Sequence, residues 1–253
     1  MSVELRSAAL EHMAAAVTKA QRSGNVAFPP GFVISPLGEG SPPLARMIQG
    51  GRGGEVRLRL YLCITMMATK QPYDLKAPRT PAGWARLLGL PPDTGPRRIA
   101  SNLKWLGDSG MIKLTPRWGA PSAIAVLDPS NPGKPYGSTP INHGRYVGMP
   151  IGLWRNGWII DLSATALALL FALLEHQGGY KVPRYVTTER RSRYGLSHGT
   201  WTRARAELEQ HQILQVTRVP QGSDFDYQRM RNAYWIDLDR LSAPSQPEGR
   251  RPG

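Results

Sequence analysis

An internal repeat is the feature that most constrains how this chain folds. Segment 84–115 contains a short helical pattern, a turn, a longer amphipathic pattern and an alternating run, and segment 191–217 contains the same series. The best alignment matches Ile99 with Trp201, Leu106 with Leu208 and Ile112 with Leu214, and it matches Leu90 with Leu196 once the first turn is given four extra residues, 91–94. A repeat of this kind predicts a duplicated fold in which each copy has the same set of elements.

Each copy predicts the same order of helices and strands. An apolar helix is expected first, over 56–69 and over 163–176, and Ser163 suits the N-cap of the second one. A short helix, a tight turn and a longer helix follow. The longer helices are expected to bury Ile99, Leu103 and Leu106 in the first copy and Trp201, Ala204 and Leu208 in the second. Alternating residues then predict hairpin strands over 111–115 with 122–127, and over 213–219 with 232–238.

This order of elements is that of a winged helix-turn-helix domain. We therefore expect an α+β chain with two winged helix-turn-helix modules in tandem, preceded by an N-terminal amphipathic helix over residues 3–20. The expected divisions are 1–54 for the N-terminal helix and a Gly/Pro-rich segment, 55–128 for the first module, 129–157 for a linker, 158–241 for the second module and 242–253 for a disordered tail.

The charge of the chain predicts a polyanionic partner. Lys and Arg number 32 against 18 Asp and Glu, a formal net charge of +14, while 41% hydrophobic residues indicate a folded protein. The partner expected is double-stranded DNA. Cys63 is the only cysteine, which fits a reducing cytoplasm, where the protein would be nucleoid- or plasmid-associated. The most apolar run, 162–174, is too short to cross a membrane. No complete phosphate-binding loop is present, so no cofactor is expected.

In the second copy the outward face of the longer helix is the best candidate for reading bases. If Trp201, Ala204 and Leu208 face inward, Thr202 and Arg203 point outward, and an outward arginine can fork onto guanine. The start of the same helix suits a phosphate. The candidate DNA-binding residues of this copy are Arg190, Arg191, Arg193, Ser197, His198, Thr200, Thr202, Arg203, Arg205, Arg229 and Arg231.

The first copy carries a second group of candidates on its longer helix and hairpin. They are Arg97, Arg98, Ser101, Asn102, Lys104 and Arg117. Asn102 could pair with adenine if it faces the groove, although it lies next to Leu103, which is expected to be buried. Trp105 on the outward side is either an interface anchor or packs under the hairpin.

The architecture resembles the replication initiators of plasmids, which carry two winged helices in one chain. The resemblance covers about two thirds of the chain and is carried by Gly195-Leu196-Ser197, the helix Thr200–Leu208 and the hairpin 213–238. It implies sequence-specific binding of origin repeats, through Thr202, Arg203 and Arg205 and through Arg97, Arg98 and Ser101. Winged helices also serve transcriptional regulators, so a regulator of that type remains an alternative.

Two further functions stay open at this point. Asp224 and Asp226 could form part of a two-metal nuclease site, but no third carboxylate or histidine completes it, so we expect no enzyme and no metal. Winged helices can also dock proteins. In that hypothesis, helix 3–20 would join two subunits as a homodimer, and DNA affinity that responds to salt would be missing.

Overall fold

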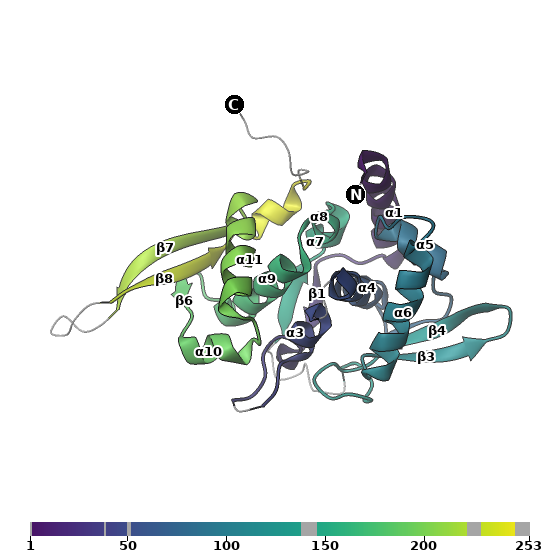
Figure 1. Cartoon of the computed structure of the whole chain (residues 1–253), viewed down its shortest axis with the longest axis horizontal. Helices are drawn as coiled ribbons and strands as arrows, with labels where there is room; N and C mark the ends of the chain where they lie inside the picture. Colours follow the sequence, from purple (N-terminus) through teal and green to yellow (C-terminus); the bar gives the residue numbers. More distant parts are fainter. Residues whose placement is uncertain (1, 38, 50–51, 138–145, 222–228, 246–253) are drawn as a thin grey trace.

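In a computed structural model, residues 2–37, 39–49, 52–137, 146–221 and 229–245 are described, and they form a mixed α+β fold (Figure 1). The strands within these residues make small antiparallel sheets, and the helices lie between and beside them. The coarse expectation of an α+β chain is therefore confirmed.

The two halves of the described chain contain the same elements in the same order. The first half holds β1 (Asn25–Phe28), α2 (Pro30–Val33), α3 (Pro43–Ile48), α4 (Arg52–Met67), β2 (Asp74–Leu75), α5 (Pro81–Leu87), α6 (Gly95–Asp108), β3 (Ile112–Arg117) and β4 (Ala120–Val126). The second half holds β5 (Val147–Pro150), α7 (Gly152–Arg155), α8 (Trp158–Asp161), α9 (Ala164–Gln177), β6 (Arg184–Tyr185), α10 (Thr188–Arg193), α11 (His198–Gln210), β7 (Leu214–Gln221) and β8 (Arg229–Ile236). Helix α1 (Val3–Ala20) precedes them and the short helix η2 (Asp239–Ser242) follows.

The sheets of the two halves have the same strand order. In the first half it is β2-β4-β3, and in the second half it is β6-β8-β7. The two aligned residues Ile112 and Leu214 begin β3 and β7, and they pair with Val126 and Ile236 respectively. The repeat therefore extends from the sequence to the register of the hairpins. The short strands β2 and β6, which each sheet adds at its edge, were not predicted.

Backbone conformation repeats as well. The amide of Met111 donates to the carbonyl of Leu106 at 2.9 Å, and the amide of Ile213 donates to that of Leu208 at 3.0 Å. Gly89 and Gly195 follow α5 and α10 with φ of 63° and 65°, the left-handed region that a side chain disfavours. The turn after each short helix is thus fixed by a glycine in the same place.

A third sheet joins the two halves directly. Strand β1 pairs antiparallel with β5, from Asn25 with Pro150 to Phe28 with Val147. Because β1 and β5 are equivalent elements, this pairing relates the halves by an approximate half-turn. Figure 1 shows the two hairpins at opposite ends of the molecule, pointing away from each other. The stretches 23–54 and 129–157, expected as a Gly/Pro-rich segment and a linker, therefore contain strands and short helices of the fold.

The core runs through both halves without a break. Helix α9 is apolar on almost every face, so it can be covered on all sides. It contacts α2, α3 and α4 of the first half. Its Phe171 meets Phe28 and Phe32, with ring centroids 5.0 and 5.8 Å apart. The expected modules 55–128 and 158–241 are therefore packed onto one another through shared side chains.

Helix ends in the second half follow the expected signals. The Ser163 hydroxyl accepts a hydrogen bond from the amide of Ala166 at 3.1 Å, which satisfies one free donor at the start of α9. Gly178 ends the same helix with φ of 53°. The predicted N-cap Ser163 is confirmed.

The two ends of the described chain pack against the fold. The apolar face of α1, with Met13 and Val17, is buried and α1 contacts α4, α5 and α7. The face that the homodimer hypothesis used is therefore covered within the chain. Ser245, placed in the expected disordered tail, is buried and its hydroxyl donates to the carbonyl of Asn156 at 2.9 Å. The rest of that tail, 246–253, lies outside the described residues.

Candidate nucleic-acid interface

Helix α11 presents an exposed polar face next to the second hairpin. Trp201, Ala204 and Leu208 are buried, as predicted from their spacing. Thr202 and Arg203 are exposed on the opposite side. Among the described residues, Arg203 has no hydrogen-bond or ion-pair partner, so its guanidinium is available to an external ligand.

The start of α11 is capped and has basic and aromatic neighbours. The Ser197 hydroxyl accepts from the amide of Thr200 at 3.2 Å. Arg191 donates to Nδ1 of His198 at 3.0 Å, and its guanidinium lies 4.9 Å from the centre of the Trp201 ring. Because arginine can only donate, Nδ1 accepts and the imidazole proton of His198 is on Nε2. These contacts orient Arg191 and His198 at the N-terminal end of α11.

Three arginines predicted to bind DNA make contacts within the fold. Arg190 donates to both oxygens of the buried Glu175 carboxylate at 2.9 and 2.7 Å. Arg193 donates to the carbonyl of Ser35 at 2.8 Å. Arg205 pairs with Glu209 one turn along α11 at 2.8 Å. We therefore remove Arg190 and Arg193 from the interface, because binding DNA would break these contacts, whereas the partly exposed Arg205–Glu209 pair costs little to break and Arg205 stays a candidate.

A hydroxyl completes the network around Glu175. Tyr194 donates to Oε2 of Glu175 at 2.7 Å and accepts from Nε of Arg190 at 3.0 Å. Burial and the neighbouring carboxylate raise the pKa of Tyr194 well above its usual value, so the phenol keeps the proton that it donates. This network fixes α10 against α9.

The second hairpin carries two described cations, the exposed Arg218 on β7, which was not among the candidates, and the candidate Arg231 on β8. Arg231 lies with its guanidinium 5.7 Å from the centre of the Tyr185 ring, across from the edge strand β6. Arg229 begins β8, but its side chain lies outside the described residues. The loop 222–228, with Asp224 and Asp226, lies outside them as well.

Helix α6 of the first half has a similar exposed face. Arg97, Ser101 and Lys104 are exposed, and Lys104 forms an exposed ion pair with Asp108 at 2.8 Å. Such a pair contributes little stability and costs little to break. Arg98 is half-buried. Asn102 is only 6% exposed and donates to the carbonyl of Arg98 at 2.8 Å, so the prediction that it pairs with adenine is wrong.

The remaining first-half candidates are fixed by neighbouring elements. Arg117, at the end of β3, donates to the carbonyl of Lys76. Trp105 is half-buried, and the guanidinium of Arg57 on α4 lies 3.9 Å from its ring centre. The contact shown for Trp105 is thus with α4 of the same half, so it bears out neither an interface anchor nor packing under the hairpin.

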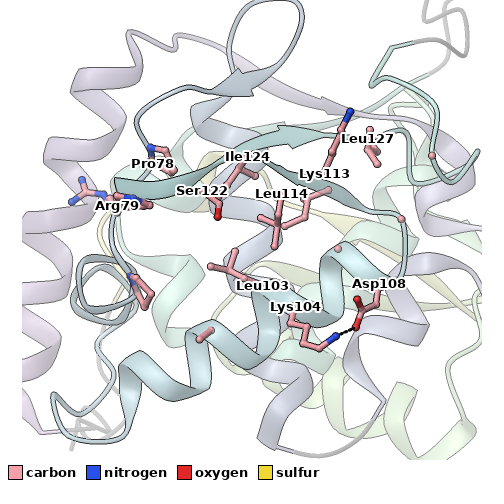
Figure 2. Close-up of a pocket in the computed structure, with 17 residues that line it drawn as sticks. Pro78, Arg79, Leu103, Lys104, Asp108, Lys113, Leu114, Ser122, Ile124 and Leu127 are labelled. Carbon is pink, nitrogen blue, oxygen red and sulfur yellow. Dashed lines mark hydrogen bonds and ion pairs between the residues drawn. The ribbon is translucent and has the colours of Figure 1, made fainter. Parts of the chain in front are cut away.

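A groove separates α6 from the hairpin β3–β4. Its volume is about 740 Å³ (Figure 2). Figure 2 shows Leu103 of α6 pointing toward Leu114 and Ile124 of the hairpin, with Lys104 and Lys113 at its side. Leu103, expected to be buried, is half-exposed in this groove.

In the second half, the positions that align with residues lining this groove carry charged side chains. Leu103 and Gly107 correspond to Arg205 and Glu209, which pair with each other. The two helix–hairpin surfaces therefore differ in chemistry, with an apolar groove in the first half and an ion pair in the second.

The described residues contain neither a metal-ion cluster nor a membrane-spanning helix. No group of three or more His, Cys, Asp or Glu in that part of the chain is placed to hold a metal ion. No helix there is long and apolar enough to span a membrane. No family model, curated protein or solved structure matches the chain.

Proposed function

We propose that this chain is a sequence-specific double-stranded DNA-binding protein in which each half is a winged helix. Helices α6 and α11 would be the recognition helices, and the hairpins β3–β4 and β7–β8 the wings. The observation that carries the proposal is the repeated order helix, strand, helix, helix, hairpin, with the same strand order in both sheets. In each half the longer helix keeps a polar face exposed beside its hairpin.

The distribution of charge supports a nucleic acid as the partner. The net charge is +14, and exposed cations stand on both longer helices and on the first hairpin, as Arg97, Arg203 and Lys113. Each phosphate that these cations neutralise releases counterions, so binding should weaken steeply with salt.

The half-turn between the halves suggests how the target is arranged. If α6 and α11 both enter major grooves, they approach the duplex in opposite senses, as the two subunits of a symmetric dimer do. A single chain would then protect two half-sites of opposite orientation. Footprinting of the bound duplex tests this, and two half-sites in the same orientation would contradict it.

Within DNA binding, we favour a plasmid or mobile-element replication initiator or a related maintenance factor. Two winged helices in one chain support this role, and a transcriptional regulator is the alternative. Several direct repeats of the whole site in the native target would favour initiation, whereas one isolated inverted repeat would favour regulation.

Duplex selection followed by fluorescence anisotropy tests the proposal. The full chain is used to select duplexes of about 30 bp, three helical turns, from a randomised pool. The selected duplex and a scrambled version are then titrated over a salt series. An affinity gap of about 10³-fold or more is the expected result. Equal weak binding to both duplexes would leave only a basic surface and overturn the proposal.

Arg203→Ala tests whether α11 contacts base edges in the major groove. Loss of a forked contact to guanine should cost about 1–3 kcal/mol on the selected duplex and relax the preference at that base pair. Arg155→Ala is the matched control, because Arg155 is also exposed but lies on α7, outside both helix–hairpin units.

Protein docking through the first half is the second candidate function. The apolar groove beside α6 favours it, since the half-buried Leu103 and Leu114 leave apolar surface open there. This function predicts no duplex affinity that falls with salt, so the same titration separates it from the first.

A further inference from the structure

Trp118 is placed unlike any other tryptophan of the described chain. Its side chain is 102% exposed, which is full exposure, whereas Trp84, Trp154, Trp158 and Trp201 are buried and Trp105 and Trp235 are half-buried. An indole offers a large apolar area, and leaving it in water gains nothing for folding. This residue therefore makes no packing contribution to the fold.

The hairpin holds Trp118 at its tip in a defined position. Ladder pairing between β3 and β4 continues to Arg117 and Ala120, so Trp118 and Gly119 form a two-residue turn. Gly119 has φ of 64°, which glycine adopts without strain. The bond from Arg117 to the carbonyl of Lys76 ties the tip to the chain that follows β2. The indole is thus carried on a supported tip.

The charge around this tip suits a polyanion. From Ile112 to Val126 the hairpin contains Lys113 and Arg117 and no acidic residue. Lys76, next to the tip through Arg117, is also exposed. An exposed indole among cations is the combination with which proteins stack on bases while holding the phosphate backbone.

We propose that Trp118 is a wedge that stacks on bases in the minor groove of bound DNA and partly separates one base step. The hairpin β3–β4 lies beside α6, so with α6 in a major groove the tip of the hairpin would reach the neighbouring backbone and the minor groove next to it. Apolar side chains inserted there unstack a base step and kink the duplex. This inference rests on the proposed function and adds to it the residue that deforms the DNA.

Binding by the full chain to the selected duplex tests the wedge. Trp118→Ala should bind more weakly, but by less than the loss of about 5- to 150-fold expected for one base–aromatic stack on a single strand, because the variant does not have to unstack a base step. Its salt slope should be unchanged because no charge is removed. Lys113→Ala, on the same hairpin, is the matched control and should reduce the slope by about 0.9. Trp118→Phe should recover part of the affinity. Equal thermal melting of the variants shows that the fold is intact.

A fluorescent base locates the insertion. 2-Aminopurine, placed at successive steps of the selected duplex, changes its emission with its stacking: it brightens when it loses a stacked neighbour and is quenched when an indole stacks on it. The wild-type chain should therefore change its emission at one step only, and Trp118→Ala should not. If wild type and Trp118→Ala bind equally and give the same emission, the wedge is wrong while DNA binding stands.

Two other results would also overturn the wedge. If the wild-type chain binds no duplex, the proposed function fails and the wedge fails with it. If Trp118→Ala converts a dimer into a monomer in sedimentation while each chain keeps its DNA affinity, Trp118 is a contact between subunits.

Discussion

At the scale of single residues, the arginines near the start of α11 divide into structural and exposed ones. Arg190 neutralises Glu175, whose side chain is only 5% exposed. Arg190→Ala should lower the free energy of unfolding by about 3 kcal/mol, because the carboxylate stays buried without its cation. Arg203→Ala should change it by less than about 0.5 kcal/mol, because the side chain is exposed. Urea denaturation of both variants checks this, and equal losses would contradict the division.

His176 makes the stability of the chain depend on pH. Burial lowers the pKa of His176 below its usual value near 6.5, and the nearby cations Arg190 and Arg184 lower it further. Nε2 of the His176 ring lies 2.9 Å from the carbonyl oxygen of Tyr185 and donates a hydrogen bond to it, because a carbonyl can only accept. The other ring nitrogen, Nδ1, is buried and has no hydrogen-bond partner. Protonation would bury an unpaired N–H at Nδ1.

The sign of the effect follows from the lowered pKa. Below pH 6.5 the unfolded chain binds this proton before the folded chain does, so stability is full above pH 6.5 and falls as pH drops toward the folded pKa. His176→Gln keeps a donor for Tyr185 and should remove part of that loss. Thermal melting at pH 7.5 and at pH 5.5 measures it; identical pH dependence in both proteins would rule His176 out.

The predicted inner face of helix α6 was wrong by one position: Leu103 was expected to be buried, and Asn102 is buried instead. The repeat aligns Asn102 with Ala204, which was expected to be buried, yet Leu103 was assigned to the inner face in its place. The alignment therefore contained the signal that Asn102 faces inward. Arg190 also had a signal, since Glu175 interrupts an apolar helix and a buried carboxylate needs a cation.

At the scale of elements, Ser163 joins the start of α9 to α11. Its hydroxyl caps α9, and both its amide and its hydroxyl donate to the carboxylate of Glu207 on α11. Ser163→Ala should cost about 1–2 kcal/mol of unfolding free energy, at the upper end for a lost cap. Ser197→Ala, which removes the exposed cap of α11, is the control and should cost about 0.5–1 kcal/mol. A smaller loss for Ser163→Ala than for Ser197→Ala would show that the link to Glu207 adds no stability.

Helices and hairpins were predictable because their periodicity is local. The expected strand 111–115 corresponds to β3, and the expected helix 163–176 corresponds to α9 within a residue or two at each end. The strands β1, β2, β5 and β6 were missed for a physical reason. Each has two to four residues, too few to show alternation, and each exists through pairing with a distant strand.

At the scale of the whole molecule, the shared core predicts one cooperative unit. Phe171 of α9 packs edge-on against Phe28 and Phe32 of the first half, which stack on each other. Phe171→Ala should lower the free energy of unfolding by about 3–5 kcal/mol, and tryptophan fluorescence and circular dichroism should still report the same transition. Tyr180→Ala, at an exposed ring, is the control with an expected loss below about 1 kcal/mol. Two separated transitions in the Phe171 variant would show that the halves unfold independently.

The repeat indicated two copies correctly but not how they are joined. Glycine and proline are frequent over 23–54 and 129–157, which suggested flexible connections. In the fold, several of these residues serve close packing. A Cβ on Gly54 would come within 2.6 Å of the carbonyl of Ile48, and a Cβ on Gly152 within 2.4 Å of that of Leu241. Composition alone does not separate a hinge from a close approach of two backbone segments.

The antiparallel pairing of β1 with β5 also affects how the sequences of the two halves can diverge from each other. Two equivalent strands related by a half-turn are the contact through which separate copies of one half would associate, so the chain has the form of a dimer whose subunits are fused. In a homodimer every substitution occurs twice, at symmetric places. Here each substitution occurs once, and aligned positions such as Ser101 and Arg203 already differ. Fusion thus lets the exposed residues of one half change while those of the other half stay the same.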